Sequence, residues 1–287
     1  MKDDQGRGTA YAILAAALYA VSIPLSKLLL GQMAATMTAG FLYLGAGLGM
    51  TVWHLAVPHG TERPLDRSDA PYAAAMVALD IAAAILMMNG LDMAAAANVA
   101  LLSNFEIVAT AVIAFFFFHE RITARLWLAI ILVTVACGLL SLQEGSFSFS
   151  LGSLLVLAAC VAWGAENNCT RRLSVKDPVQ VTALKGLGTG LGSLVIGLAV
   201  GQRPAGLGYV LLTMVLGLVS YGFSVLFYIR GQRLLGAART STWYALSPFI
   251  AGLLSLILFG SWPGPYFLVA AAIMAFGAYL TTRPEGR

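Results

Sequence analysis

The sequence predicts an all-α integral membrane protein of ten transmembrane helices, arranged as two inverted five-helix repeats. Three observations predict this fold: the chain is poor in charge, its positive charges lie in alternate loops, and its two halves resemble each other. Of the 287 residues, 59% are hydrophobic and only 10% are charged, whereas a soluble domain keeps about 25% charged residues to wet its surface. A lipid surrounding explains this deficit, because a bilayer solvates apolar side chains.

Ten apolar segments are separated by charges and turn residues. Each holds about 20 mostly apolar residues, the length that crosses about 30 Å of hydrocarbon. The last two share one uncharged stretch, which the prolines and glycines of residues 260–265 divide because they do not continue a helix. Only residues 89–92 mark a turn between the third and fourth spans. The expected spans are residues 9–29, 35–57, 71–91, 94–118, 124–142, 150–170, 178–200, 207–229, 240–259 and 264–282.

Positive charge gathers in the loops of one side. With a cytoplasmic N-terminus, only Lys27 and Arg203 fall in outside loops, and Lys185 lies within a span. This bias is typical of helical membrane proteins and places both termini in the cytoplasm. The polar residues 1–7 and the long apolar run after them argue against a cleavable signal peptide. The expected cytoplasmic group is Lys2, Arg7, Arg63, Arg67, Arg121, Arg125, Arg171, Arg172, Lys176, Arg230, Arg233, Arg239, Arg283 and Arg287.

The two halves of the chain match each other in collinear order. The sequence Leu-Gly-Ala-Gly-Leu-Gly at residues 44–49 recurs as Leu-Gly-Thr-Gly-Leu-Gly at residues 187–192, with five identities in six positions. The offset drifts only from 144 to 141 along the chain, as short loop deletions would produce. Further aligned pairs are Tyr19-Ala20 with Trp163-Gly164, Lys27 with Arg171, residues 95–97 with 236–238, Asp80 with Tyr221, and Glu106 with Ser247.

The expected repeats occupy residues 1–143 and 144–287. Each holds five spans, an odd number, so the second repeat must lie upside down relative to the first. Inverted repeats are the architecture of carriers that work by alternating access, in which two similar bundles rock around a site near the midplane. The symmetry therefore predicts a transporter, with a duplicated scaffold as the alternative.

The glycine runs at residues 44–49 and 187–192 lie in the middle of spans. A phosphate-binding loop needs a preceding strand and a helix N-terminus outside the membrane, so we interpret these runs as places of close helix packing. Cys137, Cys160 and Cys169 show no metal-ligand spacing, and their odd number argues against a disulfide framework. No metal and no cofactor are expected.

Residues 94–107, Ala-Ala-Ala-Ala-Asn-Val-Ala-Leu-Leu-Ser-Asn-Phe-Glu-Ile, followed by Phe-His-Glu-Arg-Ile-Thr at 118–123, resemble the EamA-type permeases of the drug/metabolite transporter superfamily. That family shows a small-residue helix, a proline step, a hydrophobic run and a Gly-Glu-Arg end. Here His119 replaces the glycine and Ile107 the proline, whereas Pro248 keeps the proline in the second half. Within the superfamily the chain looks most like the YddG-type exporters. That resemblance implies export of aromatic and other neutral amino acids across the bacterial inner membrane.

Four ionisable side chains of Asp, Glu, Lys or Arg lie inside the expected spans and away from the last three residues at either end, and such a group costs at least about 2.5–3.5 kcal/mol near a helix centre. Asp80 and Glu106 lie near mid-depth, and their counterparts in the other repeat are uncharged. We expect each to face substrate or carry a proton, with a structural hydrogen bond as the alternative. Glu166, a third coupling candidate, is close enough to pair with Arg171, and Lys185 is expected to snorkel to the cytoplasmic surface. Residues 119–121, His-Glu-Arg, are expected to form an interfacial ion-pair cluster.

Aromatic residues supply the rest of a predicted central pocket. Trp and Tyr give large apolar faces with one polar group each, which suits small amphiphilic substrates. Phosphate esters or nucleotide sugars would require a cluster of Arg or Lys at mid-depth, which the sequence lacks. The predicted substrate-binding residues are Tyr19, Asp80, Ser103, Glu106, Trp163, Tyr221, Trp243, Tyr244 and Ser247.

The sequence thus predicts a bacterial inner-membrane carrier that exports neutral, aromatic amino acids by alternating access. Efflux of hydrophobic drugs or other small metabolites is the alternative within the same class. An intramembrane enzyme is disfavoured, because no HExxH, GxSxG or GxGD motif is present. A scaffold or sensor would transport nothing. The net charge of +4 is scattered at segment ends, which excludes a nucleic-acid partner. Proton coupling, uniport and the oligomeric state stay open.

Overall fold

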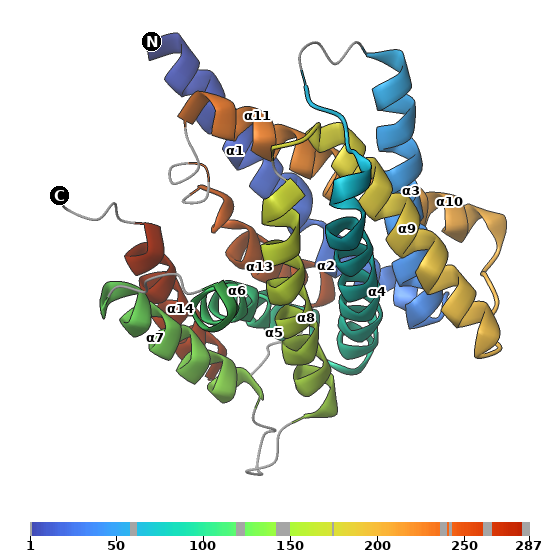
Figure 1. The fold of residues 1–287 in the computed structure, drawn as a ribbon. Coiled ribbons are helices and arrows are strands. Elements are labelled where there is room, and N and C mark those ends of the chain that lie inside the picture. Colours follow the sequence, from blue (N-terminus) through green and yellow to red (C-terminus); the bar gives the residue numbers. More distant parts are fainter. Residues whose placement is uncertain are drawn as a thin grey trace.

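A computed structural model describes residues 2–57, 62–118, 124–141, 150–173, 175–235, 240, 243–260 and 266–282. Every regular element within these residues is a helix, and the helices follow one another as ten rods (Figure 1). The predicted all-helical fold is therefore confirmed.

The five rods of the first half are formed by α1 (Lys2–Ala20) with α2 (Ser22–Leu30), α3 (Ala35–Ala56), η1 (Arg67–Asp69) with α4 (Ala70–Met93), α5 (Ala96–Leu102) with α6 (Phe105–Phe118), and α7 (Ala124–Ser141). The five rods of the second half are formed by α8 (Leu151–Leu173), α9 (Pro178–Ala199), α10 (Leu207–Gly217) with η2 (Leu218–Phe223) and α11 (Ser224–Leu235), α13 (Ser247–Phe259), and α14 (Tyr266–Thr282). The η2 segment is a π-helical turn that continues α10 into α11.

The turn between the third and fourth rods lies later than predicted. Helix α4 continues through residues 89–92 and ends at Met93. The Asn89 side chain stays within the helix, because its Nδ2 donates to the Ile85 carbonyl oxygen at 2.7 Å. Gly90 serves packing rather than a turn, since a β carbon there would lie 2.8 Å from the carbonyl oxygen of Gly152. The prediction of a turn at Asn89-Gly90 was therefore wrong in position.

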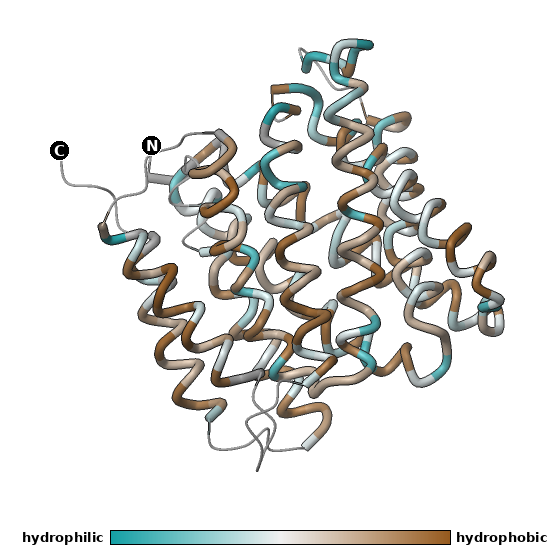
Figure 2. Tube along the Cα trace, turned by 60° about the horizontal axis from the view of Figure 1, so that its bottom comes forward, coloured by the Kyte–Doolittle hydropathy of each residue, from teal (hydrophilic) through white to brown (hydrophobic). Residues whose placement is uncertain are grey.

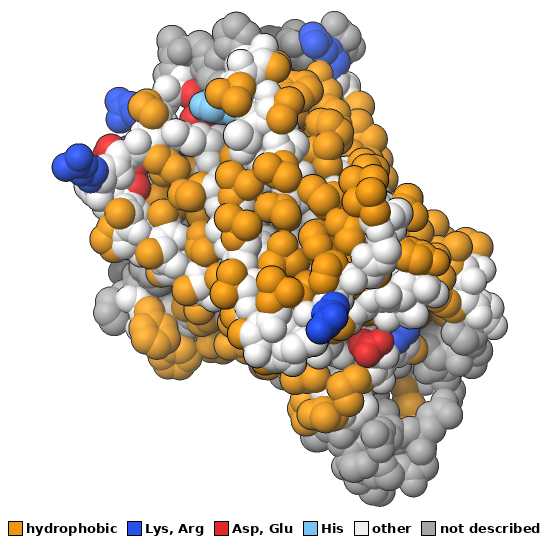
Figure 3. Space-filling model, turned by 90° about the vertical axis from the view of Figure 1, so that its right-hand side faces the viewer, with side chains coloured by type: hydrophobic (Ala, Val, Ile, Leu, Met, Phe, Trp, Pro, Cys, Tyr) orange, Lys and Arg blue, Asp and Glu red, His pale blue; other side chains and the backbone are white. Residues whose placement is uncertain are grey.

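The outer surface of the bundle is apolar. Six helical stretches of the described chain are long and apolar enough to cross a membrane, and three shorter helices are also apolar. Apolar stretches run along the helices in Figure 2, with hydrophilic segments mainly near their ends. Apolar side chains cover much of the face drawn in Figure 3, and the few charged ones lie near its upper end and in a small group in its lower half. The exposed residues of α9 and α10 include Leu191, Val195, Leu198, Leu207, Leu211, Leu212 and Val215.

The contacts between rods follow the internal repeat: when each rod is replaced by its counterpart in the other half, the same pairs of rods are in contact. Equivalent rods pack on each other in three pairs: α3 with α9, α5 with α13, and α7 with α14. The packing of α4 on α8 corresponds to that of α11 on α1, and α6 on α8 corresponds to α13 on α1. Figure 1 shows α3 and α9 side by side. This pattern is that of two intertwined repeats related by a pseudo-twofold axis.

Glycines follow the same relation at the points where backbones approach. A β carbon on Gly90 would meet Gly152 and Val156. A β carbon on Gly231, the counterpart of Gly90, would meet Gly8 and Ala12. Gly8 and Ala12 are the counterparts of Gly152 and Val156 at an offset of 144. In the same way, Gly47 packs on the Leu187 backbone and Gly190 on that of Leu44. The mid-span glycine runs thus let α3 and α9 touch backbone to backbone, as predicted.

Polar contacts at one end of the bundle tie the two halves together. The Lys176 ammonium lies 2.7 Å from an oxygen of Asp66 and 2.9 Å from one of Asp69. The hydrogen bond from Lys176 holds the pKa of Asp66 well below its usual range. His54 on α3 lies 3.3 Å from Asp177, which caps the start of α9. By the positive-inside prediction, this end faces the cytoplasm.

A methyl group added at the α3–α9 contact should destabilise the protein. In a Gly47→Ala variant the new carbon overlaps the Leu187 backbone, which cannot move without separating the helices. We expect a loss of about 1–3 kcal/mol, as for overpacked cores, seen as a lower melting temperature in detergent. The control is Gly138→Ala in α7, where nothing lies within 4 Å of the added carbon. Equal melting temperatures for the two variants would contradict the packing.

Candidate functional site

Asp80, on α4, is the polar centre of the bundle. Its carboxylate is fully buried. Oδ1 accepts hydrogen bonds from Trp163 Nε1 at 2.7 Å and the Tyr43 hydroxyl at 3.0 Å, and Oδ2 accepts one from the Thr189 hydroxyl at 3.0 Å. The donors come from α8, α3 and α9, so one carboxylate joins four helices of both repeats. A buried carboxylate has lost the hydrogen bonds that water would donate, and these three donors take their place.

Glycine packing explains why a side chain as short as threonine reaches Asp80. Thr189 is flanked by two glycines, and a β carbon on Gly190 would lie 2.5 Å from the Leu44 backbone nitrogen. Close approach of α9 to α3 therefore brings Thr189 to the protein centre. The aligned position in the first repeat is Ala46, which has no hydroxyl.

A lysine between two acids adjoins this centre. Lys185 Nζ lies 3.1 Å from Glu166 Oε2, to which it donates, and 3.7 Å from Asp80 Oδ1. The other oxygen of Glu166 accepts from the Thr170 hydroxyl. Glu166 is buried with 1% of its side chain exposed, whereas 27% of the Lys185 side chain is exposed. Two carboxylates compensate the ammonium at a depth where a lone charge would be costly.

Glu106 forms a second polar contact between the repeats. Asn167 Nδ2, on α8, donates to Glu106 Oε1 at 2.7 Å and lies 3.2 Å from the Thr110 hydroxyl oxygen. Gly164 makes this possible, because a β carbon there would lie 2.7 Å from that of Ala109 and would push α6 from α8. Glu106 is only partly buried. Its partner Asn167 is next in sequence to Glu166, which accepts the hydrogen bond of Lys185.

Three tyrosines from both repeats form an aromatic cluster. The ring of Tyr19 lies 5.7 Å from that of Tyr221 and 5.8 Å from that of Tyr244, measured between centroids. Tyr221 also contacts Tyr43 at 5.1 Å. All three cluster members are partly exposed. The cluster therefore places aromatic surface where the two repeats meet.

The polar centre and the aromatic cluster are symmetry counterparts. Asp80 contacts Trp163 in one, and the aligned residues Tyr221 and Tyr19 contact each other in the other. The repeat alignment thus holds in space. The two repeats share one backbone scaffold, but the side chains at equivalent places differ. The polar centre holds a carboxylate, whereas its counterpart is a cluster of aromatic rings.

Three of the predicted site residues stand apart from these groups. The Ser103 hydroxyl donates to the Ala100 carbonyl oxygen at 2.7 Å, at the end of α5. Trp243 is 37% exposed. The Ser247 hydroxyl is buried and receives no hydrogen bond from the described residues. The other predicted residues lie in the polar centre, beside it or in the aromatic cluster, and their binding roles stay predictions.

Sequence reasoning missed several members of the site. Tyr43, Thr189 and Asn167 were not singled out, although Thr189 is the one position at which the two glycine runs differ. The expectation that Lys185 merely snorkels was wrong, because Glu166 bonds it inside the bundle. The expected partner of Glu166, the Arg171 side chain, lies outside the described residues, as does the cluster at 119–121.

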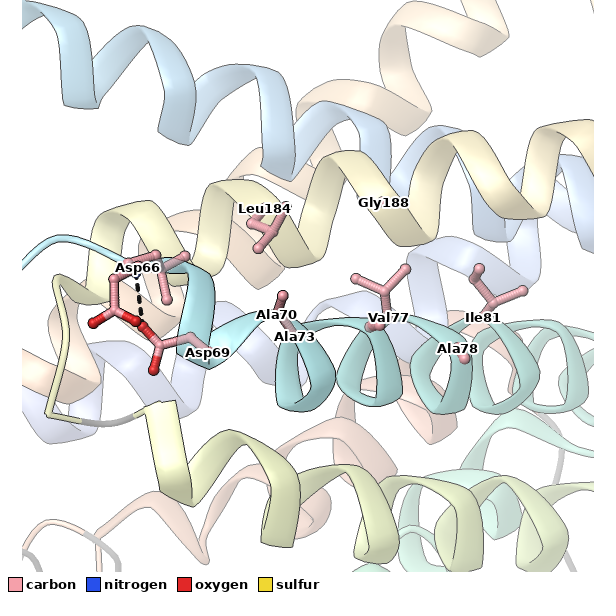
Figure 4. A pocket seen from close by; sticks show the side chains of 11 residues that line it. Asp66, Asp69, Ala70, Ala73, Val77, Ala78, Ile81, Leu184 and Gly188 are labelled. Atoms are coloured by element: carbon pink, nitrogen blue, oxygen red, sulfur yellow. Dashed lines mark hydrogen bonds between the residues drawn. The ribbon is translucent and has the colours of Figure 1, made fainter.

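An apolar groove lies between α4 and α9, away from the polar centre. Figure 4 shows Ala73, Val77 and Ile81 of α4 facing Leu184 and Gly188 of α9. The groove has a volume of about 590 Å³, and Asp66 and Asp69 lie at one end of it. Its walls offer apolar contact and few polar groups, so it suits a hydrophobic occupant rather than a charged one.

Comparison with known proteins identifies the family. The EamA-like transporter family model matches residues 6–142 and 150–283, which together span nearly the whole chain. A solved structure described only as a crystal structure of a protein is similar in fold, with a TM-score of 0.68 and 18% identity over 95% of this chain and 94% of that one. No curated protein matches the chain. The chain belongs to the EamA-like transporter family. It is a multi-pass membrane carrier with two EamA repeats, and its family is one of transporters and not of enzymes.

Replacing Asp80 by Asn should destabilise the bundle. The amide keeps the shape but has one acceptor oxygen for three donors, and a buried donor without a partner costs about 1–3 kcal/mol. We expect a lower melting temperature in detergent for Asp80→Asn. Asp92→Asn, at the exposed end of the same helix, is the matched control and should melt like the wild type. An unchanged melting temperature for Asp80→Asn would contradict the structural role of this carboxylate.

Proposed function

We propose that this EamA-family carrier exports neutral, aromatic amino acids across the bacterial inner membrane. The observation that carries the proposal is the aromatic cluster of Tyr19, Tyr221 and Tyr244, and the partly exposed Glu106 supplies a carboxylate. Aromatic rings bind an aromatic side chain, and a carboxylate binds an ammonium group. Because the cluster draws residues from both repeats, a substrate bound there would touch both moving halves.

The charge of the site favours a small zwitterion over a polyanion. A phosphate ester or nucleotide sugar would need several cations. Lys185 is the cation among the described residues of the polar centre, and it already faces Asp80 and Glu166. A neutral amino acid requires no additional cation. The substrate class is therefore one with balanced charges and an apolar or aromatic side chain.

Alternating access follows from the repeat symmetry. Exchanging the conformations of the two repeats converts a state open to one side into a state open to the other. The α3–α9 contact near Gly47 relates equivalent helices, so it can act as a pivot that both states share. The polar contacts of Lys176 with Asp66 and Asp69 lie at the end that we expect to face the cytoplasm.

Glu106 is the favoured coupling residue among the three candidates. Asp80 accepts three hydrogen bonds from neutral donors, and Glu166 accepts one from Lys185, so both carboxyl groups already have protein partners. Glu106 is partly exposed and receives the Asn167 amide on one oxygen. It can therefore take up a proton or an ammonium group without disrupting the hydrogen bonds of Asp80. A uniporter driven by the substrate gradient would need no such exchange.

Efflux of hydrophobic compounds is the second candidate function. The apolar groove between α4 and α9 favours it, because such a groove offers a hydrophobic molecule a contact surface on the outside of the bundle. A matched pair of measurements separates the two: flux of labelled amino acids and flux of an apolar dye in the same proteoliposomes. Dye flux without amino acid flux would favour the efflux function.

Labelled Trp and Phe should cross proteoliposome membranes in a saturable way. Removing one ring of the aromatic cluster, in Tyr19→Leu, should lower kcat/KM for both by about tenfold, which corresponds to about 1.4 kcal/mol of lost contact. Tyr19→Phe should retain most of the flux. The control is Tyr11→Leu, because Tyr11 makes one ring contact, with Phe227 at 5.8 Å, outside the cluster. Absence of amino acid flux above empty liposomes would refute the export function.

A further inference from the structure

We infer that Lys185 binds the carboxylate of the substrate while Glu106 binds its ammonium group, so that the carrier selects zwitterions and rejects amines. This inference rests on the proposed function and deepens it. Lys185 belongs to the second repeat and Glu106 to the first. A bound zwitterion would therefore bridge the two repeats through its own charges.

Lys185 has hydrogen-bonding capacity that its partners do not use. A lysine ammonium carries three N–H donors. One is donated to Glu166 at 3.1 Å, whereas Asp80 at 3.7 Å is too far for a hydrogen bond. Asp80 already accepts three bonds from neutral donors, which leaves it little need of the lysine. The ammonium of this partly exposed side chain can thus donate to a further acceptor, such as a carboxylate.

The two acids around Lys185 position it rather than neutralise it fully. Glu166 is almost completely buried and divides its oxygens between Lys185 and Thr170. Asp80 is fixed by three helices besides its own. The ammonium is thereby kept charged and pointed to one place inside the bundle. Preorganisation of this kind lowers the cost of binding, because no side chain must be ordered afterwards.

Glu106 supplies the opposite charge from the first repeat. Its Oε1 accepts from Asn167, and no described residue donates a hydrogen bond to its Oε2. Within the described residues no ion pair joins it to Lys185, and the partners of the two charges, Asn167 and Glu166, are consecutive residues of α8. An α-amino acid placed between these two charges would present its carboxylate to one side and its ammonium to the other. The aromatic cluster would then bind the substrate side chain.

If the role of Lys185 were purely structural, the fold would be the same, but the carrier would not distinguish amino acids from amines. If Lys185 only compensates the two acids, any aromatic molecule with an ammonium group should bind as well as the amino acid. Tryptamine, which is tryptophan without its carboxylate, makes this distinction. The test therefore compares the two ligands, and does not rely on activity alone.

The experiment measures competition against labelled Trp in proteoliposomes and thermal stabilisation of the purified protein by Trp and tryptamine. The key variant is Lys185→Met with Glu166→Gln, which removes one positive and one negative charge together and so limits misfolding. Wild type should prefer Trp by at least about tenfold, or about 1.4 kcal/mol on the affinity scale. The double variant should lose this preference, and Lys185→Arg should keep it.

Equal preference in the wild type and in a stably folded double variant would overturn the role of Lys185. Equal binding of Trp and tryptamine by the wild type would overturn it as well, while leaving the carrier function intact. Failure of the export function has a separate signature, because it would show as no Trp flux and no stabilisation by Trp in the wild type. Tyr11→Leu is the matched control, because Tyr11 stacks on Phe227 outside the polar centre and the aromatic cluster, and it should keep the preference for Trp.

Discussion

The structure depends on the buried carboxylate of Asp80, which α3, α8 and α9 all approach with a hydrogen-bond donor. In a membrane interior a charge of this kind is tolerated only where protein donors replace water. The requirement fixes the relative position of four helices from both repeats. It also fixes Trp163 and Tyr43, and through Tyr43 the Tyr221 ring of the aromatic cluster. Lys185 lies 3.7 Å from the same carboxylate and is held by its hydrogen bond to Glu166 at 3.1 Å.

One scaffold thus carries two kinds of chemistry. Backbone contacts made by Gly47, Gly190, Gly90 and Gly231 follow the pseudo-twofold axis, because helix packing depends on shape and both repeats share that shape. The polar side chains break the symmetry, since Asp80 stands opposite Tyr221 in the alignment. A carrier needs similar halves to reach similar inward and outward states, and it needs dissimilar ends to orient one substrate. The division of roles between glycines and polar residues satisfies both needs.

Most of the fold could be predicted from the sequence, because apolar length, loop charge and internal repetition each report on the membrane. The break between α4 and α5 was misplaced since Gly90 marks a close helix contact, which looks like a turn signal in sequence. The site could be predicted in part. Asp80, Trp163 and Glu106 stood out as costly or large, whereas Thr189 and Asn167 are ordinary residues whose importance appears only when helices meet. Lys185 was misread because snorkelling and internal pairing have the same sequence signal.

The most direct test of the account is the position of a bound aromatic amino acid in an experimental structure. Crystals grown with 5-bromotryptophan would reveal the bromine by its anomalous scattering, without reliance on side-chain density. The account predicts the bromine among Tyr19, Tyr221 and Tyr244, with the amino acid backbone between Glu106 and Lys185. A bromine confined to the apolar groove between α4 and α9 would contradict it and would favour a carrier of hydrophobic compounds.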